Sequence, residues 1–181
     1  MTPVRKMDHT VLGRAGELAL ALYGLVTSDG ELALFTPVAD DDHVDATGGR
    51  RGGIPAIAIQ VKTSRDVDKS GQVEARASFP AGHVREHPAF IYAVLLLDLD
   101  SVTIAASWLV PSADFNRLAY RNVDGARESL SLRAYPTRDD ACSKFRVPPL
   151  ELGPRLLSII DSLKEPIPKS FLTADNWRPV V

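Results

Sequence analysis

Residues 57–64 read Ile-Ala-Ile-Gln-Val-Lys-Thr-Ser, and this stretch decides the fold. In an extended strand, successive side chains point to opposite faces, so the two isoleucines and the valine share one face. Gln60 and Lys62 share the other face with Ala58. The strand comes after Asp45, which stands between an acidic run and a turn rich in glycine and arginine. An acid followed by a polar pair on a buried strand is typical of metal-dependent phosphodiester chemistry.

The composition fits one folded unit. The 181 residues are 45% hydrophobic and 24% charged, which is enough for one sizeable core. We predict a single domain over residues 1–165 and an extended, proline-containing tail over residues 166–181. The longest apolar run, residues 90–97, is far too short to span a bilayer, so no membrane association is expected. The single cysteine, Cys142, excludes an intramolecular disulfide and favours a cytoplasmic location.

The charges are unevenly distributed along the chain. The formal net charge is -2, so no overall basic field indicates nucleic-acid binding. Residues 1–49 carry eight acids and three bases, whereas residues 50–90 carry seven bases and four acids. An acidic pocket that attracts a metal could therefore lie beside a basic rim that attracts phosphate, although chance clustering on solvated faces would give the same pattern.

The first predicted element is a helix over residues 9–26, capped by Asp8 or Thr10. An apolar stripe recurs along it at helical spacing. The stripe consists of Val11, Ala15, Leu18, Leu22, Leu25 and Val26. The neighbours that Glu17 has on its own side of the helix are small, namely Gly13, Ala21 and Gly24. We expect this small-residue surface to let a strand, a backbone or a ligand approach closely.

The later segments predict a sheet and two more helices. Strands are expected at residues 32–37, from residue 44, at 54–63, 73–79, 90–99, 102–110 and 128–135, and helices at 111–120 and 150–163. Residues 44–63 should form an antiparallel hairpin, and residues 90–110 a second, buried one. The order predicts an α/β fold, a central mixed β-sheet flanked by helices.

This arrangement resembles the PD-(D/E)XK superfamily of restriction-endonuclease-like nucleases. It looks most like the branch that has Gln in place of the first motif residue, as in Mrr-type restriction enzymes and related bacterial domains. The resemblance rests on Gly16-Glu17, on Val44-Asp45 and on residues 59–64, and it covers about the first third of the chain.

The resemblance implies a role for each of these residues. Asp45 would be the central metal ligand, Gln60 a neutral ligand where most members carry an acid, and Lys62 the catalytic lysine. Glu17 would bind the metal directly or through water. The cofactor would be Mg²⁺ or Mn²⁺, and the activity endonucleolytic hydrolysis of DNA, of restriction or repair type. Because an amide attracts a cation less than a carboxylate does, the site would depend more on Asp45 and Glu17.

Each of these residues also has an ordinary structural explanation. Glu17 could pair with Arg14 or face water, and Asp45 could cap a backbone N–H in a turn. Gln60 and Lys62 could form the exposed face of an amphipathic strand. The alternative function is therefore a catalytically inactive nuclease-like module that binds nucleic acid or a protein partner.

DNA is the expected partner, and a homodimer is a further expectation because restriction-type nucleases commonly pair two active sites. The basic and hydroxyl residues around the motif strand are predicted to contact phosphates. These are Arg50, Arg51, Thr63, Ser64, Arg65 and Lys69. Trp108 should lie in the core. His83 and His87 have metal-ligand spacing, but Gly82 and Pro88 argue against a helix there, so no zinc site is expected.

Overall fold

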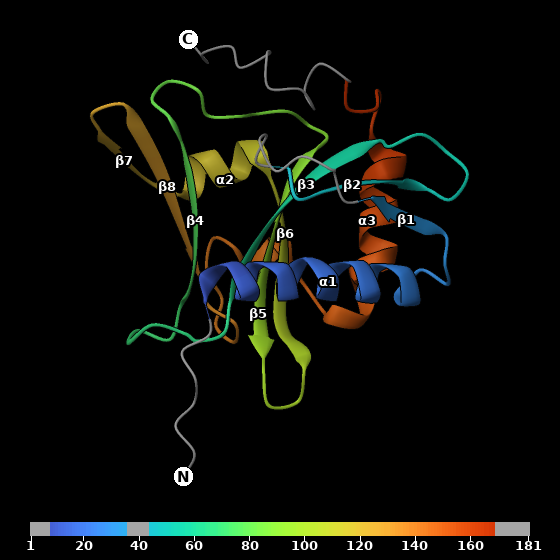
Figure 1. The fold of residues 1–181 in the computed structure, drawn as a ribbon, viewed down its shortest axis with the longest axis horizontal. Helices are drawn as coiled ribbons and strands as arrows, with labels where there is room; N and C mark the ends of the chain where they lie inside the picture. The colour runs from blue at the N-terminus through green and yellow to red at the C-terminus, as the bar shows by residue number, and fades with distance from the viewer. Residues whose placement is uncertain (1–7, 36–43, 169–181) are drawn as a thin grey trace.

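The structure is a computed structural model, and it describes residues 8–35 and 44–168. The elements follow in the order α1 (His9–Thr27), β1 (Leu32–Phe35), β2 (Ala46–Arg50), β3 (Ile57–Ser64), β4 (Val73–Pro80), β5 (Phe90–Asp98), β6 (Thr103–Pro111), α2 (Ser112–Leu118), β7 (Tyr120–Asp124), β8 (Arg127–Ala134), β9 (Arg146–Val147) and α3 (Leu152–Ser162). Two 3₁₀ turns, Ser143–Phe145 and Pro149–Glu151, flank β9. Figure 1 shows α1 crossing in front of the strands and α3 beside β1 and β2.

The central sheet contains six strands in the order β1-β2-β3-β5-β6-β9. β3 pairs with β2 in antiparallel register and with β5 in parallel register, so the sheet is mixed. β2 pairs with residues 57–59 of β3 and β5 with residues 58–64, and residues 57–61 are all buried. The α/β fold with a central mixed sheet flanked by helices is therefore confirmed, as are both predicted hairpins.

A second sheet, which the sequence did not predict, lies beside the first at the left of Figure 1. Its three antiparallel strands have the order β4-β8-β7. Along β4 and β8, buried apolar residues alternate with more exposed polar ones, as expected of a sheet with one face packed and one face solvated. Segment 73–79 was predicted as a strand, but β7 was not predicted as one.

Two helices cover opposite faces of the central sheet near β3. A Cβ added to Gly16 of α1 would lie 1.9 Å from Thr63 Oγ1, so the Thr63 face of β3 packs against α1. Strand alternation then puts Gln60 and Lys62 on the other face. Gln60 is opposite Tyr92 of β5, and the Tyr92 ring stacks on Phe115 of α2 with 3.8 Å between centroids. α2 therefore covers the face that carries Gln60.

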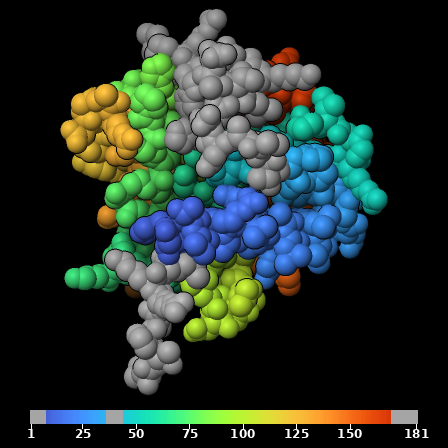
Figure 2. All heavy atoms as spheres, viewed as in Figure 1, coloured from blue at the N-terminus to red at the C-terminus, as the bar shows by residue number. Residues whose placement is uncertain are grey.

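α1 begins as predicted, because the Asp8 side chain accepts a hydrogen bond from Thr10 N at 3.0 Å. α1 lies at the surface of the molecule (Figure 2, in blue), and its apolar stripe faces solvent rather than the core. Its leucines and valines are exposed at Val11, Leu18, Leu22, Leu25 and Val26. The buried side of the helix carries Leu12, Gly16, Leu20 and Gly24. Close approach at Gly16 and Gly24 therefore determined which side of the helix packs; of the small residues predicted around Glu17, Gly24 lies on this side, whereas a Cβ on Gly13 would meet no atom within 4 Å.

The C-terminal part of the described chain also packs against the sheet. Ile167 is 5% exposed, and its N–H donates to the Ala56 carbonyl oxygen at 2.8 Å. The packed core therefore extends into the segment that was predicted to be a tail. Trp108 is fully buried, as predicted, and residues 83–87 are not helical. Among the described residues, no helix has both the length and the apolar character that crossing a bilayer requires.

Candidate active site

Asp45 precedes β2 and is held against β3. Its N–H donates to the Ile59 carbonyl oxygen at 2.9 Å, and its Oδ2 accepts a hydrogen bond from Val61 N at 2.6 Å. The register that pairs Ala46 with Ile59 places Asp45 next to Gln60. Asp45 therefore does cap a backbone N–H, which was its ordinary structural explanation. The same hydrogen bond fixes its carboxylate beside the motif strand.

Gln60 is 2% exposed, and its Oε1 has no hydrogen-bond partner in the described structure. Leaving a buried amide oxygen unpaired costs about 1–3 kcal/mol, so such an atom requires an explanation such as a water or an ion. The exposed amphipathic face that was the alternative explanation for Gln60 is not observed.

Lys62 is half-buried on the same face of β3. Burial lowers the pKa of its ammonium below the ordinary value of 10.5, and the negative charge of Asp45 opposes that shift. The ammonium and the Asp45 carboxylate are thus electrostatically coupled. A desolvated lysine with a charge partner is typical of functional sites, although structural ion pairs also perturb lysines.

Asp45 and Gln60 together present oxygen donors of the kind that Mg²⁺ prefers. Mg²⁺ keeps several waters and is bound through one or two carboxylates plus substrate phosphates, so a small donor set fits it. The unpartnered oxygen of Gln60 fits a neutral ligand. Within residues 8–35 and 44–168, no three His, Cys, Asp or Glu side chains cluster closely enough to hold a metal. The acidic run that precedes Asp45, residues 40–42, lies outside the described residues.

Glu17 occupies a different position from these three residues. Its Oε2 accepts a hydrogen bond from Arg14 Nη1 at 2.5 Å, and its side chain is 24% exposed. It stands on α1, which packs on the Thr63 face of β3. The structure thus brings Asp45, Gln60 and Lys62 together, while Glu17 makes the helix-surface ion pair that was its ordinary explanation. Its role at a metal stays a prediction.

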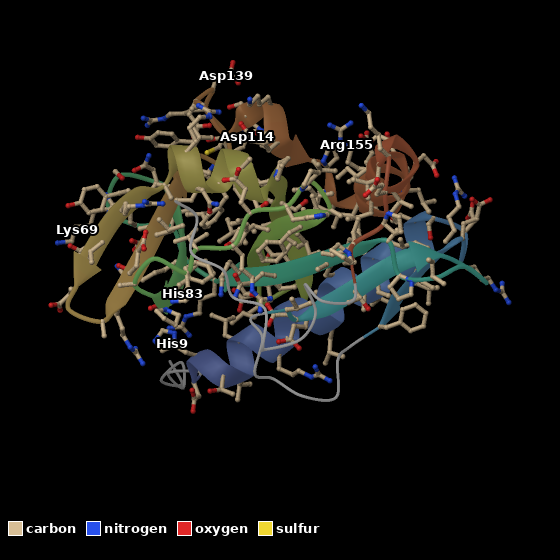
Figure 3. All side chains as sticks on the ribbon, turned by 90° about the horizontal axis from the view of Figure 1, so that it is seen from above. His9, Lys69, His83, Asp114, Asp139 and Arg155 are labelled. Carbon is tan, nitrogen blue, oxygen red and sulfur yellow. The ribbon has the colours of Figure 1, made fainter. Side chains whose placement is uncertain are left out.

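A groove of about 780 Å³ opens at the end of β3. Lys62 lines it together with the predicted phosphate contacts Thr63, Ser64 and Arg65. The loop that follows is ordered by its own polar contacts: Ser64 Oγ donates to the Asp66 carbonyl oxygen at 2.7 Å, and Arg65 Nε lies 3.0 Å from Asp66 Oδ2. Lys69 is exposed further along this loop, at the left edge of Figure 3. The groove therefore links the lysine to several of the side chains predicted to bind phosphate.

Arg50 and Arg51 lie elsewhere. Arg50 forms two hydrogen bonds with Asp161 of α3, at 2.9 and 2.7 Å, and one with Glu31 at 2.8 Å. These bonds raise its pKa further above the ordinary value. Five residues of extended chain separate Arg50 from Asp45, a distance of about 16 Å. Arg50 thus connects β2 to α3 through its bonds to Asp161. Its predicted contact with a phosphate stays untested.

Two residues that line the groove, Glu74 and Arg76, were not among the predicted site residues. Both lie on β4, whose alternating pattern did predict a strand. Their position next to β3 depends on how the second sheet packs, and the local sequence carries no signal of that packing.

The mixed central sheet, with helices on both faces, defines an α/β fold. A solved structure that shares it is that of a bacterial homing endonuclease, I-Ssp6803I. The TM-score is 0.52 at 13% sequence identity, over 77% of this chain and 86% of the homing endonuclease. Comparison with protein-family models and with curated sequences gives no match.

Proposed function

We propose that this chain is a Mg²⁺-dependent endonuclease that hydrolyses DNA phosphodiester bonds, with Mn²⁺ as an alternative cofactor. The observation that carries the proposal is the placement of Asp45 beside the buried, unpartnered Gln60 oxygen and the desolvated Lys62. The fold shared with a homing endonuclease supports the same class of activity.

In this proposal Asp45 and Gln60 hold the metal, which when bound would supply positive charge at the phosphate and lower the pKa of a water. Asp45 keeps its orientation through the hydrogen bond from Val61 N. Lys62 orients the attacking water or stabilises the negative charge that develops on the phosphate, and the partly buried setting strengthens that interaction. The role of Glu17 at the metal stays a prediction, because α1 packs on the face of β3 opposite Gln60 and Lys62 and Glu17 pairs with Arg14.

The second candidate is a nuclease-like module that binds DNA without cutting it. It is favoured by the ion pair of Glu17 with Arg14, which leaves Asp45 as the one of the two predicted metal-binding carboxylates that lies against the motif strand. The two functions differ in whether the protein cleaves the DNA that it binds or only binds it.

The test is cleavage of supercoiled plasmid by wild type, Asp45→Asn and Lys62→Ala, in Mg²⁺, in Mn²⁺ and in EDTA. We expect wild type to cut only with metal, and each variant to lose about 10²-fold or more, the usual cost of removing one charge-stabilising group. Arg155→Ala, an exposed arginine on α3, is the matched control and should cut like wild type.

Calorimetric titration with Mn²⁺ provides a readout that does not depend on activity. Asp45→Asn should weaken Mn²⁺ binding, whereas Lys62→Ala should retain it. Equal trace cleavage in all proteins would indicate contamination and would remove the catalytic claim. DNA binding without any cleavage by wild type would establish the second candidate instead.

A further inference from the structure

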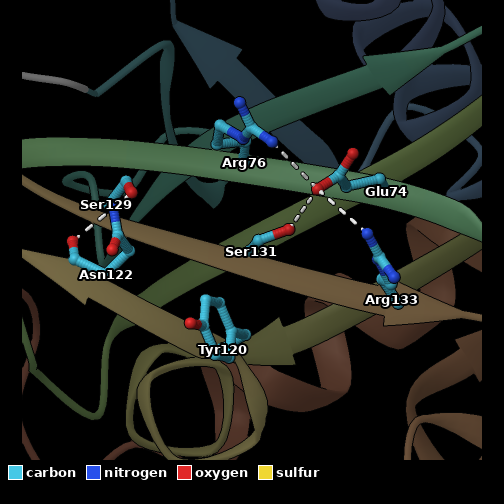
Figure 4. A pocket seen from close by; sticks show the side chains of 7 residues that line it. All are labelled: Glu74, Arg76, Tyr120, Asn122, Ser129, Ser131 and Arg133. Atoms are coloured by element: carbon cyan, nitrogen blue, oxygen red, sulfur yellow. Dashed lines mark hydrogen bonds and ion pairs between the residues drawn. The ribbon is translucent and has the colours of Figure 1, made fainter.

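The outer face of the second sheet carries a cavity of about 520 Å³ (Figure 4). Its polar lining comes from all three strands of that sheet. The residues that matter are Glu74 and Arg76 of β4, Ser129, Ser131 and Arg133 of β8, and Tyr120 of β7. None of them was among the residues predicted from the sequence to bind a ligand.

The charges in this cavity favour an anion. Glu74 lies between two guanidinium groups, 3.2 Å from Arg76 Nη2 and 4.0 Å from Arg133 Nη2. A hydrogen bond from Ser131 Oγ, aided by Arg76, holds the pKa of Glu74 below its ordinary value, so the carboxylate is ionised at neutral pH. Two positive charges then face one negative charge. Each guanidinium has five N–H donors and uses few of them on Glu74, so both can still donate to a phosphate.

The shape of the cavity suits a polymer backbone. Strand register places Arg76, Ser131 and Tyr120 in one row across the sheet, with the small serine between the two large side chains. Ser129, two residues before Ser131 on β8, is another small side chain on the same face of this central strand. A phosphate can therefore approach the floor of the sheet between the arginine and the phenol. Tyr120 is 75% exposed and offers a ring to a sugar or a base.

This cavity lies next to the groove beside the motif strand. Glu74 and Arg76 line both of them, so β4 forms a shared wall. A strand of nucleic acid whose phosphate lies at Lys62 would pass Arg76, which lines both hollows, before it reaches Arg133. The basic residues of the second sheet would then bind phosphates that flank the one being cut.

We propose that the outer face of the second sheet is the DNA-docking platform of this protein, with Arg76 and Arg133 binding backbone phosphates and Tyr120 packing against the sugar-phosphate chain. This inference rests on the proposed action on DNA. Glu74 tunes the affinity, because its charge orients the two arginines but repels the phosphates. The contacts are to the backbone, so they position the substrate without reading its sequence.

The test is fluorescence anisotropy with a 30-base-pair duplex in EDTA, using the full chain and a series of salt concentrations. The variants are Arg76→Ala/Arg133→Ala and Glu74→Gln, with Arg155→Ala as the control arginine on α3. We expect the double variant to bind at least tenfold more weakly and to lower the slope of log K against log salt by about two, one for each lost phosphate contact. Glu74→Gln should bind more tightly than wild type, and Arg155→Ala should match it. Circular dichroism of each variant shows whether the fold is intact.

The outcomes separate this proposal from the proposed function. If wild type binds and cuts DNA while the folded double variant has the same affinity and salt slope, the platform is only the solvated face of an antiparallel sheet, and the inference fails alone. If wild type does not bind DNA, both proposals fail. If the double variant does not fold, the isosteric Glu74→Gln variant decides. Unchanged affinity of Glu74→Gln for the duplex overturns the platform, and tighter binding supports the platform.

Discussion

Lys62 carries an ammonium group in a partly buried position, and burial disfavours the charged form. Because burial lowers its pKa, the unfolded chain binds more protons than the folded protein between the lowered value and 10.5. Stability should therefore rise with pH across that interval, and the destabilising effect of the buried ammonium is fully present below it. A charge kept at a cost to stability is expected where function requires it.

Lys62→Met should for this reason unfold at a higher urea concentration than wild type at pH 7, and the difference should shrink as the pH approaches 10.5. Lys69→Met, which removes an exposed ammonium, is the control and should leave the urea midpoint nearly unchanged. Urea titrations at several pH values measure both. A Lys62→Met protein that is less stable than wild type at pH 7 would show that the attraction to Asp45 outweighs desolvation.

The predicted site shows how far residue patterns extend. Alternation along residues 57–64 placed Gln60 and Lys62 on one face correctly, and the hairpin brought Asp45 to them, because strand periodicity and register follow from local sequence. Alternation does not indicate that both faces of a strand are covered, so the burial of Gln60 was not predictable. The ion pairs of Arg50 with Asp161 and Glu31 link positions distant in sequence, and no spacing rule indicates them.

At the scale of elements, α1 departs most from simple pattern reading. Its leucines and valines form the usual amphipathic stripe, yet that stripe faces solvent. The two buried glycines allow the backbone to come close to β3 and to the start of α3, where a Cβ on Gly153 would lie 2.6 Å from the Gly24 carbonyl oxygen. Close packing of small residues thus prevailed over the larger apolar area of the stripe.

Leu20 and Leu22 provide a matched test of this orientation. Leu20 is 1% exposed and Leu22 is 59% exposed, two positions apart on the same helix. Leu20→Ala should lower the free energy of unfolding by about 2–5 kcal/mol, and Leu22→Ala should change it by no more than about 0.5 kcal/mol. Denaturant titration measures both values. Equal losses at the two positions would mean that the stripe is also buried.

At the scale of the whole molecule, the contact between α1 and the central sheet holds two layers together. Gly16→Ala would bring a Cβ to 1.9 Å from Thr63 Oγ1, and such overpacking usually costs about 1–3 kcal/mol. Gly13→Ala on the same helix meets no atom within 4 Å and should gain about 0.5–1 kcal/mol through helix propensity.

Thermal unfolding of the two variants gives the comparison, with Gly16→Ala melting lower than wild type and Gly13→Ala higher. Adding Thr63→Ala to Gly16→Ala should recover part of the loss, because it removes the overlapping hydroxyl. A failure of Thr63→Ala to recover any stability would place the close contact elsewhere.

The second sheet is assembled from two separate excursions of the chain. β4 lies in the crossover between the parallel strands β3 and β5, a connection that is usually a helix. β7 and β8 lie between α2 and β9. Neither excursion interrupts β2, β3 or β5, which carry or flank Asp45, Gln60 and Lys62. The surface around the site is therefore modular. The two inserts could be exchanged together for another pair, which would change the outer surface and leave the central sheet unaltered.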